Sequence, residues 1–96
     1  PICDILKIFL PYRKFACWYR TLIIRAYQTQ KRACHYLQIS NGNMNRYCNG
    51  QQIPSIRFFV KSLRKCCAIL DLDVNQTMLD GLALIPDEKP TEFDNE

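Results

Sequence analysis

Apolar side chains recur every three or four residues along a first long stretch of the chain, residues 12–39. The alternating spacing places them on one face of an α-helix. The positions are Phe15, Tyr19, Leu22, Ala26, Thr29, Ala33 and Tyr36, with Trp18, Ile23 and Leu37 widening the stripe. Pro11 precedes this stretch, where a first helical turn tolerates proline. The pattern predicts one long amphipathic helix over residues 12–39.

Two further helices are predicted in the second half of the chain. The longer one covers residues 54–70, where apolar positions keep helical spacing over the whole stretch. Those positions are Ile56, Phe59, Val60, Leu63, Cys67 and Leu70. The shorter one covers residues 77–84, begins with a partial capping signal from Thr77 to Asp80, and is stopped by Pro86.

The remaining segments predict one loop and one additional helical piece. Residues 40–52 contain two Asn-Gly pairs, at Asn41 and at Asn49, and this turn chemistry predicts a loop. Residues 2–10 (ICDILKIFL) are too apolar to remain in water, so we expect them to pack against the rest of the chain. An additional N-terminal helical segment is one form of this packing, and a helix that begins near Asp4 and is kinked at Pro11 is the alternative.

The chain of 96 residues is long enough for one domain only, since domains usually hold about 100–150 residues. Its 48% hydrophobic content indicates a folded chain, and no apolar run is long enough to span a membrane. The predicted fold is all-α: a small bundle of two long helices and one short helix. It occupies residues 1–85, and residues 86–96 form an acidic tail.

Charge divides sharply along the chain although the net charge is only +4. Residues 1–67 hold twelve lysines and arginines against Asp4 alone, whereas residues 68–96 hold Lys89 against eight acids. Such asymmetry is typical of an interaction surface or a charged tail. One interpretation is that the tail lies on the basic body and screens it.

Six cysteines in a short chain permit three disulfides. Cys66 and Cys67 are adjacent, so on a helix they point about 100° apart and would reach different neighbours. The even count predicts a bundle stapled by disulfides, with a bridge between Cys34 and Cys48 as one candidate. The candidate bridging residues are Cys3, Cys17, Cys34, Cys48, Cys66 and Cys67.

No pattern in the chain predicts catalysis, a metal or a cofactor. His35 is the only histidine, and it has no acid or second histidine at a useful spacing. No Cys-x-x-Cys pair is present to supply half of a zinc site. We therefore expect a non-enzymatic protein without cofactor or metal.

The basic helix faces are the candidate contact surface for an acidic protein partner or an anionic surface. Nucleic acid is disfavoured because the aromatic residues fall on the apolar stripe and the acidic tail would compete with phosphate. The predicted partner-binding residues are Arg20, Arg25, Arg57, Lys61, Arg64 and Lys65.

The run Trp18-Tyr19-Arg20, followed by an apolar stretch and Arg25, resembles the Leu-Tyr-Arg opening of the small mitochondrial LYR-motif proteins. Those proteins are basic three-helix adaptors that bind acyl carrier protein and serve respiratory-complex assembly or iron–sulfur delivery. Trp18 departs from the family's leucine, and Arg25 lies one position later than the family's second arginine. The resemblance covers residues 18–25 and implies Tyr19 and Arg20 as contacts with a carrier protein.

Two hypotheses follow for the function. The first is a secreted, disulfide-stapled module acting as a ligand, effector or binder, and it is supported by the Asn75-Gln76-Thr77 sequon for glycosylation at Asn75. The second is an intracellular accessory subunit or adaptor with free thiols, in a mitochondrial or other assembly. The state of the cysteines separates the two.

Overall fold

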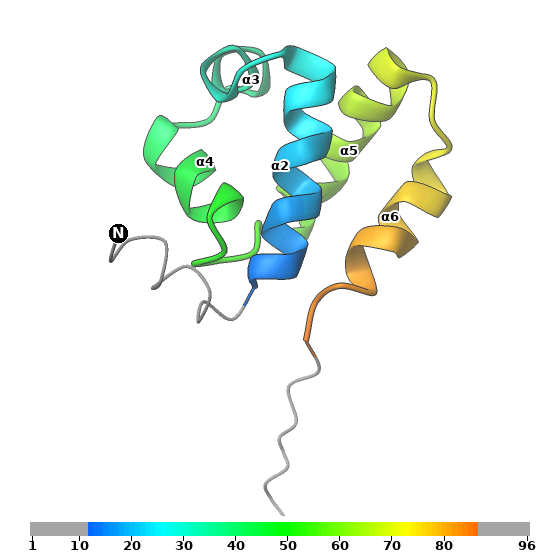
Figure 1. Cartoon of the computed structure of the whole chain (residues 1–96). Coiled ribbons are helices and arrows are strands. Elements are labelled where there is room, and N and C mark those ends of the chain that lie inside the picture. The colour runs from blue at the N-terminus through cyan, green and yellow to red at the C-terminus, as the bar shows by residue number, and fades with distance from the viewer. Residues whose placement is uncertain (1–11, 87–96) are drawn as a thin grey trace, which may run out of the picture.

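The protein is built from helices and connecting turns over residues 12–86, the part that the computed structural model describes. The helices are α2 (Arg13–Tyr27), α3 (Gln30–Leu37), α4 (Asn41–Cys48), α5 (Ile56–Leu70) and α6 (Val74–Leu82) (Figure 1). The predicted all-α class is confirmed. Residues 2–10 and the acidic tail, apart from Pro86, lie outside the described residues.

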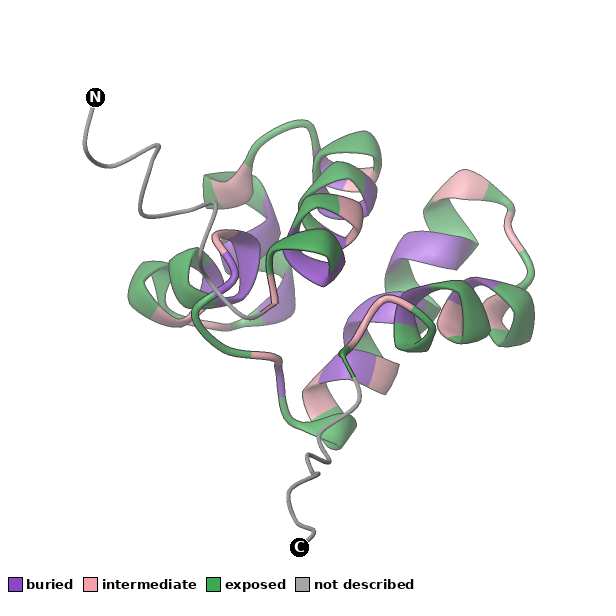
Figure 2. Cartoon of the chain, turned by 60° about the horizontal axis from the view of Figure 1, so that its bottom comes forward, coloured by how far each residue is buried: buried purple, intermediate pink, exposed green. Residues whose placement is uncertain are grey.

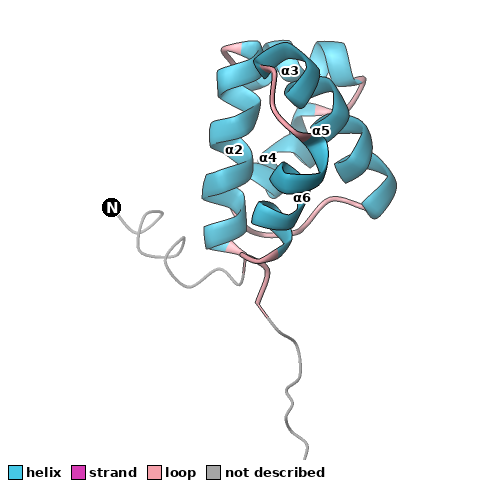
Figure 3. Ribbon diagram, turned by 90° about the vertical axis from the view of Figure 1, so that its right-hand side faces the viewer, coloured by secondary structure: helices cyan, strands magenta, loops and turns pink. Residues whose placement is uncertain are grey.

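Helix α2 is the centre of the bundle, because it contacts each of the other four helices. In Figure 1, α3 and α4 lie on one side of α2 and α5 and α6 on the other. Figure 3 shows α2 along one edge of the molecule, with α6 and α5 beside it. Within residues 12–86, five helices take the place of the predicted two long helices and one short helix.

The predicted single helix over residues 12–39 is wrong, because the chain breaks into α2 and α3 at Gln28 and Thr29. Gln28 takes a positive φ of 78°, and its backbone N–H still bonds to the carbonyl of Ile24. Thr29 is extended, and its hydroxyl accepts the N–H of Arg32, which caps α3. The threonine counted in the apolar stripe is thus a helix cap.

The predicted loop over residues 40–52 contains a helix that its composition conceals. Ser40 caps α4 by accepting the N–H of Asn43, so the first Asn-Gly pair lies within the first helical turn. Met44, Tyr47 and Cys48 are buried at helical spacing, and this burial outweighs the weak helix propensity of the surrounding asparagines. The second Asn-Gly pair does form a turn, in which Gly50 has a φ of 88°.

The helix predicted over residues 54–70 is confirmed as α5, capped by Ser55. The short helix begins earlier than predicted, at Val74 instead of Thr77. Asp73 is the reason: its carboxylate accepts the N–H groups of Asn75 and Gln76 and so caps α6. Thr77 is buried inside the helix.

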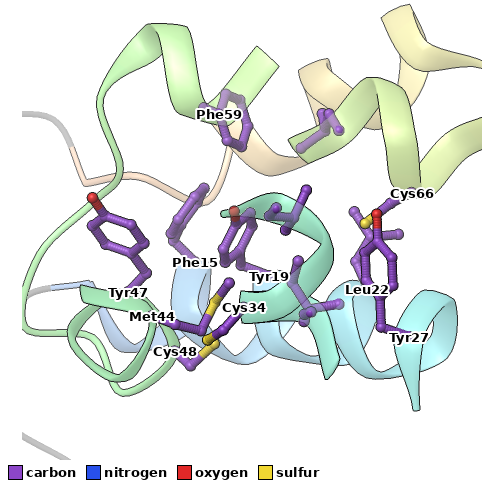
Figure 4. Close-up of a cluster of buried hydrophobic side chains, with 14 residues drawn as sticks. Phe15, Tyr19, Leu22, Tyr27, Cys34, Met44, Tyr47, Cys48, Phe59 and Cys66 are labelled. Atoms are coloured by element: carbon purple, nitrogen blue, oxygen red, sulfur yellow. The ribbon is translucent and has the colours of Figure 1, made fainter. Parts of the chain in front are cut away.

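The buried faces of the helices meet in one core, coloured purple in Figure 2 and drawn as sticks in Figure 4. Phe15 stacks on Tyr19 with ring centroids 5.6 Å apart, and both rings pack against Phe59 of α5. The hydroxyls of Tyr19 and Ser62 lie 2.8 Å apart inside this core. The aromatic cluster therefore joins α2 to α5.

The predicted disulfide staples are wrong for the described cysteines, all of which are free thiols. Four of them, Cys34, Cys48, Cys66 and Cys67, are buried and pack as small apolar side chains. Cys34 and Cys48 belong to the same core cluster without forming the candidate bridge (Figure 4). Cys17 is exposed, and Cys3 lies outside the described residues.

Candidate binding surface on α2

The six predicted partner-binding residues are all exposed and are divided between two helices. Arg20 and Arg25 are on α2, whereas the other four are on α5. These two helices pack against each other through their buried faces. The α5 residues are Arg57, Lys61, Arg64 and Lys65.

One residue of the α5 face has a contact within the bundle. The ammonium group of Lys61 donates a hydrogen bond to the carbonyl of Leu37, at a distance of 3.3 Å. Leu37 ends α3, and a cation there complements the negative end of the helix dipole. Lys61 thus has a stabilising role in the fold.

The exposed face of α2 carries a groove of about 480 Å³, here called the α2 groove. Trp18 and the largely buried Leu22 are the apolar residues of its lining. Arg13, Lys14 and Arg25 line the same groove, and none of the lining residues is acidic. The lining residues are Arg13, Lys14, Cys17, Trp18, Thr21, Leu22 and Arg25.

Trp18 lines the α2 groove and packs against residues of α2, α5 and α6. Its ring lies 5.7 Å from that of Phe15 and 6.3 Å from that of Phe59, measured between centroids. On its other edge it packs against Gly81 of α6, so closely that a Cβ atom there would overlap the indole. A packed, partly exposed tryptophan beside arginines is typical of a binding hot spot.

A small pocket of about 110 Å³ continues the basic surface on the other side of Cys17. Arg13 and Arg20 line it together with Asn49, which follows α4. The side-chain oxygen of Asn49 is buried there and accepts no hydrogen bond from the protein. This pocket therefore presents the cations of Arg13 and Arg20, while the buried oxygen of Asn49 is inaccessible to a partner.

The carboxylates of the described residues are few and lie on other parts of the surface. They are Asp71, Asp73 and Asp80. Asp73 caps α6, and Asp80 accepts a hydrogen bond from the side chain of Gln76. None of these three carboxylates lines the α2 groove, so no acid of residues 12–86 neutralises its cations there.

The structure corrects what the LYR-like run implied for Tyr19. This side chain is fully buried, and its hydroxyl is bonded to Ser62, so it is inaccessible to a carrier protein. Burial also raises its pKa above the ordinary value of 10.0. Arg20 remains exposed, as a contact residue must be.

Two further sequence candidates have clear positions. His35 is exposed on α3, with its ring edge-on to Tyr36. Asn75 is exposed in the first turn of α6, whereas Thr77 of the same sequon is buried. Across residues 12–86, no three histidine, cysteine or acidic side chains gather as metal ligands.

Sequence reasoning missed the place of Trp18 in the α2 groove. Trp18 widens the apolar stripe in the sequence and was therefore expected in the core. Trp18 lies four residues after Lys14 and seven before Arg25, which places all three on one helix face. This spacing could have indicated from the sequence that Trp18 lies beside the cations.

Within residues 12–86, no helix is long and apolar enough to cross a membrane. No protein-family model, no curated protein and no solved structure matches the chain.

Proposed function

We propose that this protein is a small helical interaction module that binds an acidic segment of a partner protein through the α2 groove. It acts by binding and not by catalysis. The observation that carries the proposal is that Arg13, Lys14 and Arg25 line one groove together with Trp18, with no acid among the lining residues.

Charge complementarity defines the partner. A cationic groove attracts an acidic chain and orients it, while the indole supplies an apolar contact for one of its side chains. The neighbouring pocket adds Arg20 to the cations that such a chain would meet. An acidic peptide with one apolar anchor fits these features together.

The thiols favour one of the two settings that the sequence left open. Disulfides persist in oxidising compartments, and free thiols are usual in reducing ones. The five free cysteines therefore support an accessory subunit or adaptor of an intracellular assembly over a secreted module.

Charge reversal tests the groove. Lys14→Glu with Arg25→Glu reverses two cations that border Trp18, and both residues are exposed, so the fold should be retained. The matched control is Arg57→Glu with Arg64→Glu, which makes the same change of charge on α5. The probe is a fluorescein-labelled, glutamate-rich peptide with one phenylalanine, followed by anisotropy.

The α2 pair should weaken peptide binding about tenfold or more, as for a loss of about 1.4 kcal/mol, and the α5 pair should change it much less. Circular dichroism checks that both variants are helical. Equal losses in the two variants would indicate general charge attraction, and a larger loss in the α5 pair would place the interface on α5. Either result would refute the α2 groove as the site.

A further inference from the structure

A second cavity shares no lining residue with the α2 groove and lies where the end of α2, one side of α3 and the last turns of α5 meet. Its volume is about 430 Å³, within the roughly 300–1,000 Å³ of small-molecule sites. We call it the Tyr36 cavity. The lining residues are Ala26, Tyr27, Gln28, Arg32, Tyr36, Lys65, Ala68 and Ile69.

The Tyr36 cavity combines an aromatic wall with an apolar floor. The rings of Tyr27 and Tyr36 are stacked, with centroids 5.7 Å apart and planes inclined by 15°. Tyr27 is buried at the end of the core cluster (Figure 4), and Tyr36 is 53% exposed. Ile69 of α5, also 53% exposed, continues the apolar surface. A flat aromatic group finds both stacking and apolar contact here.

Two cations border the same cavity from different helices. Arg32 comes from α3 and Lys65 from α5, and no acidic residue lines the cavity. A guanidinium presents several N–H donors in one plane, which suits the oxygens of a phosphate or carboxylate. The two cations therefore add an anion site to the aromatic wall.

The backbone at Gln28 gives an independent reason to assign a function to this cavity. Its φ of 78° and ψ of −39° are sparsely populated for a residue other than glycine. Its side-chain oxygen accepts a hydrogen bond from Nη1 of Arg32 at 2.5 Å. The strained residue thus orients the cation at the cavity, and such strain is concentrated at binding sites.

From this juxtaposition we infer that the Tyr36 cavity binds a small planar aromatic anion of nucleotide size. The aromatic ring lies against Tyr36 and the apolar floor, and the anionic group is held between Arg32 and Lys65. This site is separate from the α2 groove and does not depend on the function proposed there.

Adenosine monophosphate is the probe, with adenosine and inorganic phosphate as its two halves. Isothermal titration should give binding of the intact nucleotide at least tenfold tighter than binding of either half. In ¹H–¹⁵N spectra of the full chain, the largest shifts should map to Gln28, Arg32, Tyr36 and Lys65. Absence of nucleotide binding, or phosphate binding as tightly as the nucleotide, would overturn the inference.

Matched substitutions test the two cations. Arg32→Gln and Lys65→Gln should each weaken nucleotide binding about fivefold or more. The controls Lys31→Gln and Arg64→Gln change exposed neighbours that do not line the cavity, and they should alter binding less than twofold. Equal effects in the lining and control variants would show attraction to overall positive charge and would refute the site.

Discussion

The hydroxyl of Tyr19 donates a hydrogen bond to that of Ser62, 2.8 Å away in the core between α2 and α5. Tyr19 is assigned as the donor because a serine hydroxyl has only one proton, and Ser62 donates its proton to the carbonyl of Phe59 at 3.0 Å. Because both side chains are fully buried, neither hydroxyl can exchange this partner for water.

Ser62→Ala is expected to destabilise the fold by about 1–3 kcal/mol, because the Tyr19 hydroxyl is left buried without a partner. Tyr19→Phe removes the donor and should cost about 1 kcal/mol, since Ser62 keeps its bond to Phe59. Urea unfolding measures both variants and the double variant. A double variant whose loss equals the sum of the two would contradict coupling between these hydroxyls.

Gly81→Ala is expected to destabilise the protein by about 1–3 kcal/mol, because the new Cβ would overlap the Trp18 indole. The control is Gly42→Ala in the first turn of α4, where a Cβ would meet only the Arg46 side chain at 3.9 Å. That substitution should be neutral or stabilising by up to about 1 kcal/mol. Thermal unfolding separates the two outcomes, and a neutral Gly81→Ala would contradict the close packing of α2 on α6.

The cysteines should differ strongly in their rates of alkylation by iodoacetamide. Cys17 is exposed and should react in the native protein. The buried thiols should react at least about a hundredfold more slowly, because iodoacetamide reaches them only when the fold opens. These are Cys34, Cys48, Cys66 and Cys67. Peptide mass spectrometry assigns the labels. If the buried cysteines became reactive in urea only after reduction, disulfides would be present and the free-thiol state would be wrong.

Stability should fall at alkaline pH because of two buried thiols. Burial raises the pKa of Cys48 from 9.0 to about 11 and that of Cys66 to about 12. Above pH 9 the unfolded chain therefore releases protons that the folded chain retains, which favours unfolding. The two thiols therefore leave the free energy of unfolding unchanged below about pH 8. Above about pH 9 the free energy of unfolding should decrease by about 1 kcal/mol per thiol and pH unit.

Urea unfolding in the presence of a reductant, from neutral pH to pH 10, measures this slope. Cys66→Ala should reduce the slope whatever its effect on the stability at neutral pH. An unchanged slope in that variant would show that Cys66 is not the titrating group.

Removal of residues 86–96 tests whether the acidic tail screens the body. The deletion takes away five acids and Lys89, so the remaining chain is more basic. If the tail screens the α2 groove, the truncated chain should elute from heparin at higher salt than the full chain. Identical elution of the two chains would refute the screening interpretation.

The sequence predicted α5 well because its apolar period, its Ser55 cap and its length all agree. It did not reveal the break at Gln28, since no glycine or proline marks the position and the helical period continues through it. The composition of residues 40–52 also indicated a loop, whereas burial of Met44 and Tyr47 favours α4. In both places tertiary packing outweighs the local pattern.

The candidate sites were predictable only in part. The basic residues of α2 and α5 could be identified from their positions outside the apolar stripe, and all six are exposed. The pairing of Tyr27 with Tyr36 requires the turn at Gln28, and the support of Trp18 requires Gly81, which is distant in sequence. Such juxtapositions depend on the fold as a whole.

The central position of α2 has a consequence for biosynthesis. Among the described helices, α2 is the first to be made, yet the aromatic face around Phe15 and Tyr19 is covered by Phe59 of α5. During translation that face stays exposed until α5, in the second half of the chain, has left the ribosome. We therefore expect the bundle to close late, with this aromatic face of α2 exposed on the nascent chain until α5 is made.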